Sequence, residues 1–303
     1  MEDGEQKKAF TPETREIAES LLTLDQRKRL LIFNAALTKS SRAIFHQCLD
    51  PNNRRAESDL EKMRRIYFHI AENFYLSVYK TPKAQAIVDL FALYGSIDYC
   101  QDIMSSDIFT RFMSDLDPKH FNQTTEFDMM SSQGLLAYLY KYSSFEEFRD
   151  GTKPVLNMVK AQYDQGAVTH FFGNVACANF TAALITNYCQ APFTRFHLYQ
   201  YSRKAALRYG PKFGEFQTLE SQFAGINRST EGICIVDGFC ASGESIEKSI
   251  DGFRKNGFNG QIFVFIGYGS YPTIHSHRTE QLYPQKRLFP GEEAEDSMFL
   301  RVV

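Results

Sequence analysis

The stretch Gly232-Ile-Cys-Ile-Val-Asp-Gly-Phe-Cys-Ala-Ser-Gly-Glu-Ser245 decides the fold of this chain. Its apolar residues Ile233 to Val236 are typical of a short buried strand, which ends at the acid Asp237. Small and polar residues follow, and apolar residues then recur at helical spacing from Ile246 to Phe253. A helix therefore begins near Ser245. A Gly/Ser loop between a strand and a helix N-terminus binds anions, because backbone N–H groups and the positive end of the helix dipole meet there.

The same alternation continues on both sides of this stretch. A β-rich run, a helix, a strand-like alternation and a further apolar run occupy Val168–Phe172, Ala176–Tyr188, Phe193–Tyr199 and Ile262–Ile266. Strands that alternate with helices predict an α/β fold, in which a parallel sheet is flanked by helices. Ligands of such sheets bind at the carboxyl ends of the strands, where Asp237 lies.

The N-terminal half has a different character. Apolar residues at helical spacing predict a helix over Ser58–Tyr79, and Ser144 with Glu147 forms a capping box before a helix that extends to Gln165. The basic pair Arg64-Arg65 is read as part of a solvated helix face. We therefore expect two domains: an all-α domain of unknown role over residues 1–150 and an α/β domain over residues 151–303.

Composition narrows the classes of function. The 303-residue chain is 43% hydrophobic with a formal net charge of −2, which argues against broad electrostatic binding to nucleic acid. The chain has no apolar run of membrane-spanning length and no signal peptide in its first ten residues. The six cysteines are scattered without a CxxC pair, which favours free thiols in a reducing compartment. We expect a cytoplasmic protein that does not bind membranes.

Over residues 150–270 the chain resembles the type I phosphoribosyltransferases. In that family an apolar strand ends in two acids, and Thr/Ser-Gly-x-Thr/Ser and a helix follow. Ile233–Asp237 and Ala241–Ser245 match this pattern. The segment Val168–Gly173, the helix after it and the strand ending at Leu198 are similar to the family's first strand, pyrophosphate loop, first helix and second strand. The family also has variable elements outside its core, called hoods, and residues 271–303 or the helical half fit that description.

The resemblance implies a role for each part of the site. The 5-phosphate of phosphoribosyl pyrophosphate would bind the loop of Ala241, Ser242, Gly243, Glu244 and Ser245. Asp237 would accept hydrogen bonds from the ribose hydroxyls. Mg²⁺ would bridge these hydroxyls and the pyrophosphate, touching Asp237 only through ribose hydroxyls or water. The pyrophosphate loop would comprise Gly173, Asn174, Val175 and Ala176. Arg203 and Lys204 would act in catalysis by closing over the departing pyrophosphate. Members of the family are often homodimers.

Two departures from the family pattern keep several functions open. Gly238 replaces the second acid, and Ala241 stands where some members have a general base. The chain is then either an enzyme that transfers a phosphoribosyl group to an unidentified acceptor, or a catalytically degenerate relative that binds a nucleotide or a protein partner. In a third alternative the helical half is itself the interaction module. A further alternative concerns the fold, because Asp237-Gly238 between apolar residues is also a hairpin signal.

Overall fold

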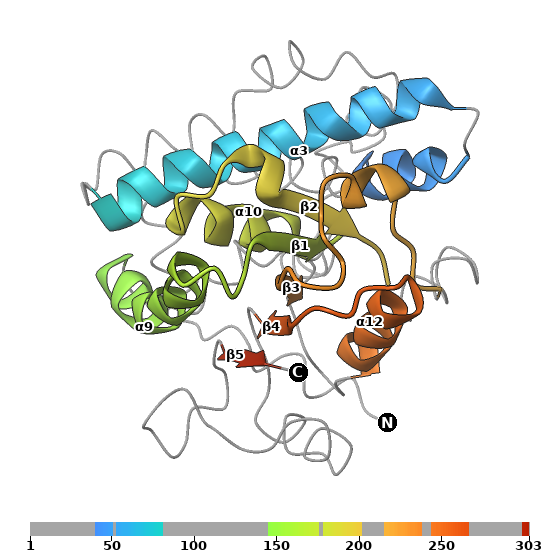
Figure 1. The fold of residues 1–303 in the computed structure, drawn as a ribbon. Helices are drawn as coiled ribbons and strands as arrows, with labels where there is room; N and C mark the ends of the chain where they lie inside the picture. The colour runs from blue at the N-terminus through green and yellow to red at the C-terminus, as the bar shows by residue number, and fades with distance from the viewer. Residues whose placement is uncertain are drawn as a thin grey trace, which may run out of the picture.

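The computed structural model describes residues 40–50, 53–80, 145–175, 178–201, 215–237, 244–266 and 299–302. These residues form a sheet with helices on both faces (Figure 1). The strands are β1 (His170–Asn174), β2 (Phe196–Tyr199), β3 (Ile233–Asp237), β4 (Ile262–Ile266) and β5 (Phe299–Val302). The main helices are α3 (Arg54–Tyr75), α9 (Phe145–Asp164), α10 (Asn179–Tyr188) and α12 (Glu244–Lys255). Shorter turns of helix are η2 (Leu76–Lys80), η4 (Phe193–Arg195) and η6 (Glu220–Phe223), and residues 40–48 are also helical.

The strand order in the sheet is β2-β1-β3-β4-β5. Strands β1 to β4 are parallel, and β5 pairs antiparallel with β4. The predicted parallel sheet with flanking helices is therefore confirmed. The hairpin alternative at Asp237 is wrong, because β3 pairs in parallel with strands on both sides and the chain is helical again from Glu244. From β1 the chain continues outward through α10 to β2, whereas from β3 it continues in the opposite direction through α12 to β4.

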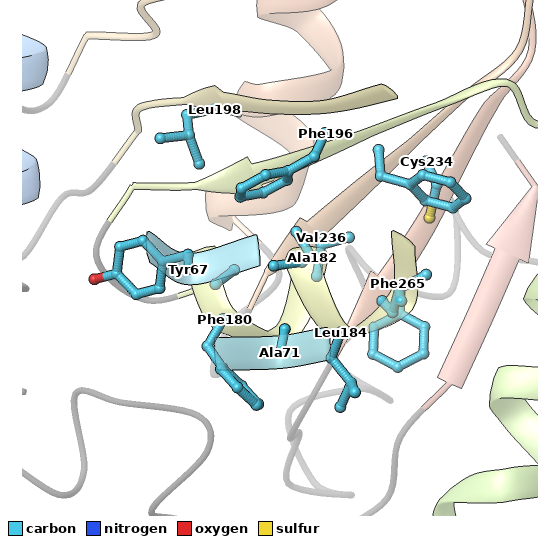
Figure 2. Close-up of a cluster of buried hydrophobic side chains, with 14 of the residues drawn as sticks. Tyr67, Ala71, Phe180, Ala182, Leu184, Phe196, Leu198, Cys234, Val236 and Phe265 are labelled. Carbon is cyan, nitrogen blue, oxygen red and sulfur yellow. The ribbon is translucent and has the colours of Figure 1, made fainter. Parts of the chain in front are cut away.

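The two faces of the sheet carry separate apolar cores, because successive side chains in a strand point to opposite faces. Phe171, Val236 and Phe265 point toward α9 and α10, and Figure 2 shows several of the buried side chains on this face. Phe172, Ile235 and Val264 belong to the core of the other face, which α12 covers. All five residues of β3 and of β4 are buried, so the centre of the sheet is closed to solvent on both faces.

Helix α3 lies outside α10 and packs along it (Figure 1). The rings of Phe74 and Phe180 meet edge to face with 5.5 Å between centroids, and Asn187 donates a hydrogen bond of 3.1 Å to the carbonyl of Phe68. The predicted helix over Ser58–Tyr79 is confirmed, with a start at Arg54 because the side chain of Asn53 caps it through the Ala56 N–H. The described residues of the helical half thus share one core with the sheet. The boundary at residue 150 stays a prediction.

The outer edge of β2 has a partner for each of three successive outward-facing residues. The carbonyl of Phe196 accepts a hydrogen bond from Arg64 of α3, and the N–H of Leu198 donates to the side chain of Gln222 at 2.7 Å. Gln200 then exchanges two backbone hydrogen bonds of 2.9 Å with Gln217. The interpretation of Arg64 as a solvated residue is wrong, since its side chain is only 12% exposed and serves this edge.

Three strands differ from the sequence predictions, and α10 begins at Asn179 with Ala178 as its N-cap, later than the predicted start at Ala176. Residues Phe193–Arg195, predicted as strand, form a 3₁₀ turn that starts after Pro192, and β2 begins only at Phe196. Strand β1 begins two residues later than predicted and extends to Asn174. Strand β5 was not predicted, because its four residues gain their strand pairing from β4, which is distant in sequence. None of the helices within the described ranges combines the length and apolar character that crossing a bilayer requires.

Candidate functional site at the carboxyl ends of the strands

Asp237 is the last residue of β3, and only 4% of it is exposed. By strand alternation it lies on the same face as Ile233 and Ile235, which pack against α12. A carboxylate is costly to bury unless polar groups surround it. Asp237 lies at the tip of β3, beside β1. From these two adjacent parallel strands the chain continues toward opposite edges of the sheet. In open α/β sheets this switch point is where ligands bind.

The end of β1 lies directly beside Asp237. Gly173 pairs with Val236 in the register of β1 and β3, so Asn174 is the neighbour of Asp237. A Cβ atom on Gly173 would lie 2.9 Å from the Cβ of Ala182 and 3.1 Å from the carbonyl oxygen of Ala178. Glycine is therefore needed here for α10 to begin this close to the strand. The N-terminus of α10 consequently lies at the same edge as Asp237.

Asn174 holds the chain that leaves β2. Its side-chain amide donates a hydrogen bond of 2.8 Å to the carbonyl of Tyr201, and its side-chain oxygen accepts one of 3.2 Å from the N–H of Tyr201. The last backbone bond between these segments joins the N–H of Val175 to the carbonyl of Tyr199 at 2.7 Å. β1 ends at Asn174, and the carboxamide of Asn174 takes the place of a backbone ladder partner for Tyr201. Asn174 is 2% exposed, so its hydrogen bonds to Tyr201 are buried.

The chain returns to the same edge at Phe216 and Gln217. The antiparallel bridge between Gln200 and Gln217 fixes both ends of the intervening segment at the end of β2. The ring of Phe216 occupies the space over Gly252 of α12, where a Cβ atom would overlap the ring. The same ring packs on Phe253, with 5.0 Å between centroids. Phe216, at the end of the segment between Gln200 and Gln217, is therefore packed against α12.

Helix α12 supplies a positive dipole end at this edge. It starts at Glu244 and returns toward the start of β4, so its N-terminus lies on the side of the sheet where β3 ends. The start of the helix at Glu244 confirms the prediction of a helix beginning near Ser245. Inside its first turns, the hydroxyl of Ser249 donates a hydrogen bond of 2.7 Å to the carbonyl of Ser245. Arg254 and Lys255 lie in its last turn, where their positive charges interact favourably with the negative end of the dipole.

The predicted site residues divide into two groups. Gly173, Asn174, Val175, Asp237 and Ser245 are described, and the topology brings them to one edge of the sheet. Glu244 is described as the first residue of α12, without its side chain. The remaining predicted residues lie outside the described residues: Ala176, Arg203, Lys204, Ala241, Ser242 and Gly243.

Asp237 offers one carboxylate to a metal ion at this edge. Among the described residues, no group of three or more His, Cys, Asp or Glu side chains is placed to hold a metal. Asp237 is a single carboxylate, and Gly238 follows where the family pattern has a second acid. Mg²⁺ commonly keeps water and substrate phosphate oxygens around one or two protein carboxylates. The described donors therefore fit Mg²⁺ only if water and substrate oxygens complete its coordination.

Sequence reasoning missed a polar network at the opposite, amino edge of the sheet. Arg195 Nη1 lies 2.5 Å from His170 Nε2, and His170 Nδ1 lies 2.8 Å from His197 Nε2. Glu231 stands beside this network, 3.8 Å from His170 and 3.9 Å from Arg195. Burial, reinforced by the charge of Arg195, lowers the pKa of His170 to about 4. Burial and the nearby Arg64 hold the pKa of His197 well below its ordinary value.

A signal for this network is present in the sequence but incomplete. His170 and Phe172 alternate in one strand, and His197 and Tyr199 alternate in the next, which is compatible with both histidines lying on one face. Their pairing depends on the register of β1 against β2, which places His197 opposite Phe172. That register cannot be predicted from the local sequence pattern of either strand.

The fold and this edge define the class of protein as an α/β protein with a switch point in a parallel sheet. Comparisons with protein-family models, with curated proteins and with solved structures give no match to this chain.

Proposed function

We propose that this protein binds a phosphorylated ribose compound, either phosphoribosyl pyrophosphate or a nucleoside monophosphate, at the carboxyl ends of β1 and β3. One observation carries the proposal: a buried carboxylate, Asp237, ends the central strand at the switch point of the sheet, and the N-terminus of α12 lies at the same edge. Carboxylates accept hydrogen bonds from sugar hydroxyls, and helix N-termini bind phosphate. The two groups together match the two ends of a ribose 5-phosphate.

Each group then has a chemical task. Asp237 binds the ribose hydroxyls, and the backbone N–H groups before α12 bind the 5-phosphate, with hydroxyls from Ser242 and Ser245. The close approach of α10 to Gly173 leaves the chain after β1 beside Asp237, where a pyrophosphate would follow the ribose. Mg²⁺, when bound, neutralises part of the pyrophosphate charge. Arg203 and Lys204 face the leaving group in this proposal.

Transfer of the phosphoribosyl group is the stronger form of the proposal, and binding without turnover is the second candidate. Transfer would break the bond between the anomeric carbon and pyrophosphate and form a bond from that carbon to the acceptor. Gly238 and Ala241 favour the second candidate, because they remove the second acid and the general base of the family pattern. In that form the protein is a nucleotide-responsive binding protein, and a protein partner or a second copy would bind through its helical half.

Calorimetry separates these candidates. Phosphoribosyl pyrophosphate is titrated into the full chain with and without Mg²⁺, and the titration is repeated with Asp237→Asn, which keeps the shape of the side chain and removes its charge. The matched control is Asp251→Asn, because Asp251 is exposed on α12. We expect binding in the wild type and the control and at least a tenfold loss with Asp237→Asn, or about 1.4 kcal/mol.

Two outcomes decide between enzyme and binding protein. Release of pyrophosphate with any member of a panel of nucleobases assigns the transfer reaction. Binding that depends on Asp237 without pyrophosphate release assigns the binding function. Equal affinities of the wild type and Asp237→Asn would overturn the proposed site.

A further inference from the structure

Gln200, just after β2, is a buried glutamine whose side chain makes no hydrogen bond. Only 2% of the residue is exposed, and both Nε2 and Oε1 lack a partner among the described residues. The side-chain oxygen of Gln217 is buried and lacks a partner in the same part of the chain. Most buried polar atoms in proteins are hydrogen-bonded, because burial without a partner gives up the hydrogen bonds that water would supply. These three atoms therefore favour a state in which the two side chains are exposed.

The two glutamines face each other where the returning segment, residues 215–219, meets the end of β2. Their backbones exchange two hydrogen bonds of 2.9 Å, so their side chains lie on the same face of the sheet with Cβ atoms about 5 Å apart. By alternation this is the face of Phe196 and Leu198, which carries the apolar core under α10. The closed bridge thus buries three polar atoms on an apolar face.

The ring of Phe216 holds the returning segment from the opposite face. Its centroid lies 5.0 Å from that of Phe253 and 5.8 Å from that of Tyr199, and the ring covers Gly252. This packing and the two backbone hydrogen bonds favour the closed segment, whereas the buried carboxamides oppose it. The opposition is substantial, since one buried polar group without a partner costs as much as one or two backbone hydrogen bonds contribute.

We propose that the returning segment is a strap that opens from β2 while the sheet stays folded. In the open state the bridge between Gln200 and Gln217 is broken, the Phe216 ring leaves α12, and water binds both carboxamides. The strap meets the sheet at the carboxyl end of β2, with β1 between it and the strand that ends in Asp237. Opening therefore changes the surface of the edge that holds the candidate site. It requires no ligand and is independent of the proposed function.

A second buried glutamine on the same strand edge provides a matched control. Gln222 is 6% exposed, and its side-chain oxygen accepts a hydrogen bond of 2.7 Å from the N–H of Leu198. Methionine is similar to glutamine in length and carries no amide. Gln222→Met removes a hydrogen bond that stabilises the edge, whereas Gln200→Met removes the cost of a buried carboxamide. The two substitutions should therefore have opposite effects.

Hydrogen exchange of backbone amides tests the strap in the full chain without ligand. In the wild type we expect the Gln217 amide to exchange by local opening, with protection at least about tenfold below that of the most protected amides of β3 and β4, which report global unfolding. Gln200→Met should raise the protection of the Gln217 amide about tenfold, or about 1.4 kcal/mol in the opening equilibrium. Gln222→Met should lower the protection of the Leu198 amide.

Two further variants keep the test decisive if Gln200→Met does not fold. Gln217→Met changes a half-buried side chain and should raise the protection of the Gln200 amide, whereas Phe216→Ala should lower it, because the ring holds the strap closed. Equal protection of the Gln217 amide and the amides of β3 in the wild type would show that the strap opens only with the whole protein. That result, or unchanged or lower protection in the glutamine variants at 200 and 217, would overturn the proposal.

Discussion

His170 and His197 lie in adjacent parallel strands and share one hydrogen bond, with 2.8 Å between Nδ1 of the first ring and Nε2 of the second. Arg195 fixes the direction of this bond. A guanidinium only donates, so Nε2 of His170 must accept from it, and the neutral ring carries its proton on Nδ1. His170 then donates to His197, whose own proton is left on Nδ1. That nitrogen is buried and has no hydrogen-bond partner among the described residues.

The first prediction is that both rings are locked as the Nδ1–H tautomer. Long-range proton–nitrogen NMR at about pH 7.5, well above the histidine pKa range, should show unprotonated Nε2 atoms in both His170 and His197. Replacing Arg195 with alanine removes the donor that imposes this direction, so a mixture of tautomers should then appear. An Nε2–H signal from His170 in the wild type would contradict the assignment.

The second prediction concerns stability at acid pH. The low pKa keeps His170 neutral in the folded protein down to about pH 4, whereas a histidine in the unfolded chain titrates near a pKa of about 6.5. Between these values the unfolded state binds the additional proton, so the free energy of unfolding falls as the pH falls from about 6.5 to 4, and levels off below. The loss from His170 is on the order of 3 kcal/mol.

Urea unfolding at a series of pH values checks this second prediction. The double variant His170→Gln/His197→Gln serves as the control, because glutamine keeps hydrogen-bonding capacity without titrating. Its stability should vary less than that of the wild type across the window. Parallel pH profiles for the two proteins would show that other groups, and not this pair, are responsible. The charged groups facing the pair, Arg195, Glu231 and Arg64, are unchanged in this control.

The third prediction contrasts two neighbouring arginines. Arg64 and Arg65 both lie over the ring of Phe193, at 4.7 and 4.6 Å from its centroid, and both form ion pairs with Glu61. Of the two, Arg64 also binds the carbonyl of Phe196. Arg64→Met should therefore lower the free energy of unfolding by about 1–3 kcal/mol, because it leaves that carbonyl without its partner. Arg65→Met should change it by no more than about 0.5 kcal/mol, since its side chain is 64% exposed.

Denaturant melts of the two arginine variants decide the comparison. Equal losses would mean that stacking on Phe193, and not the hydrogen bond to β2, determines the stability. A loss confined to Arg65→Met would contradict the burial of Arg64.

The fourth prediction tests the packing of the returning segment on α12. A methyl group at position 252 would overlap the Phe216 ring, so Gly252→Ala should destabilise the fold by about 1–3 kcal/mol even though alanine favours helix. Truncating the ring by Phe216→Ala should remove this penalty in the double variant. A double-mutant cycle on the free energy of unfolding measures the coupling, and additive effects would show that the two residues do not touch.

Much of the fold is visible in the sequence because the strands and helices have strong local patterns. The apolar runs at 233–236 and 262–266 indicated buried strands, and the spacing after Ser245 marked α12. Strand β5 and the pairing of His170 with His197 depend on pairing between segments distant in sequence. No local pattern predicts such pairing. The 3₁₀ turn at Phe193–Arg195 overrode an alternating pattern because Pro192 fixed the backbone at its start.

In the candidate site, too, local sequence patterns predict some features, whereas others depend on pairing between distant segments. The carboxylate at the strand tip and the helix after it follow from the order of residues around Asp237. The use of the Asn174 amide does not, because it depends on where β2 ends relative to β1. The sequence predicts Asn174 in a ligand-binding loop, and the structure shows that its side chain forms two hydrogen bonds with the backbone of Tyr201. Whether the backbone of this loop binds pyrophosphate stays a prediction.

The partners along the outer side of β2 have a consequence for association. An uncovered edge strand invites another chain to add a strand, which is a common route to aggregation. Here Arg64 binds the carbonyl of Phe196, Gln222 binds the N–H of Leu198, and Gln217 binds both backbone groups of Gln200. A neighbouring molecule therefore meets an interrupted row of donors and acceptors over these residues. A dimer of this protein would accordingly assemble through other surfaces, and not by merging two sheets side by side at β2.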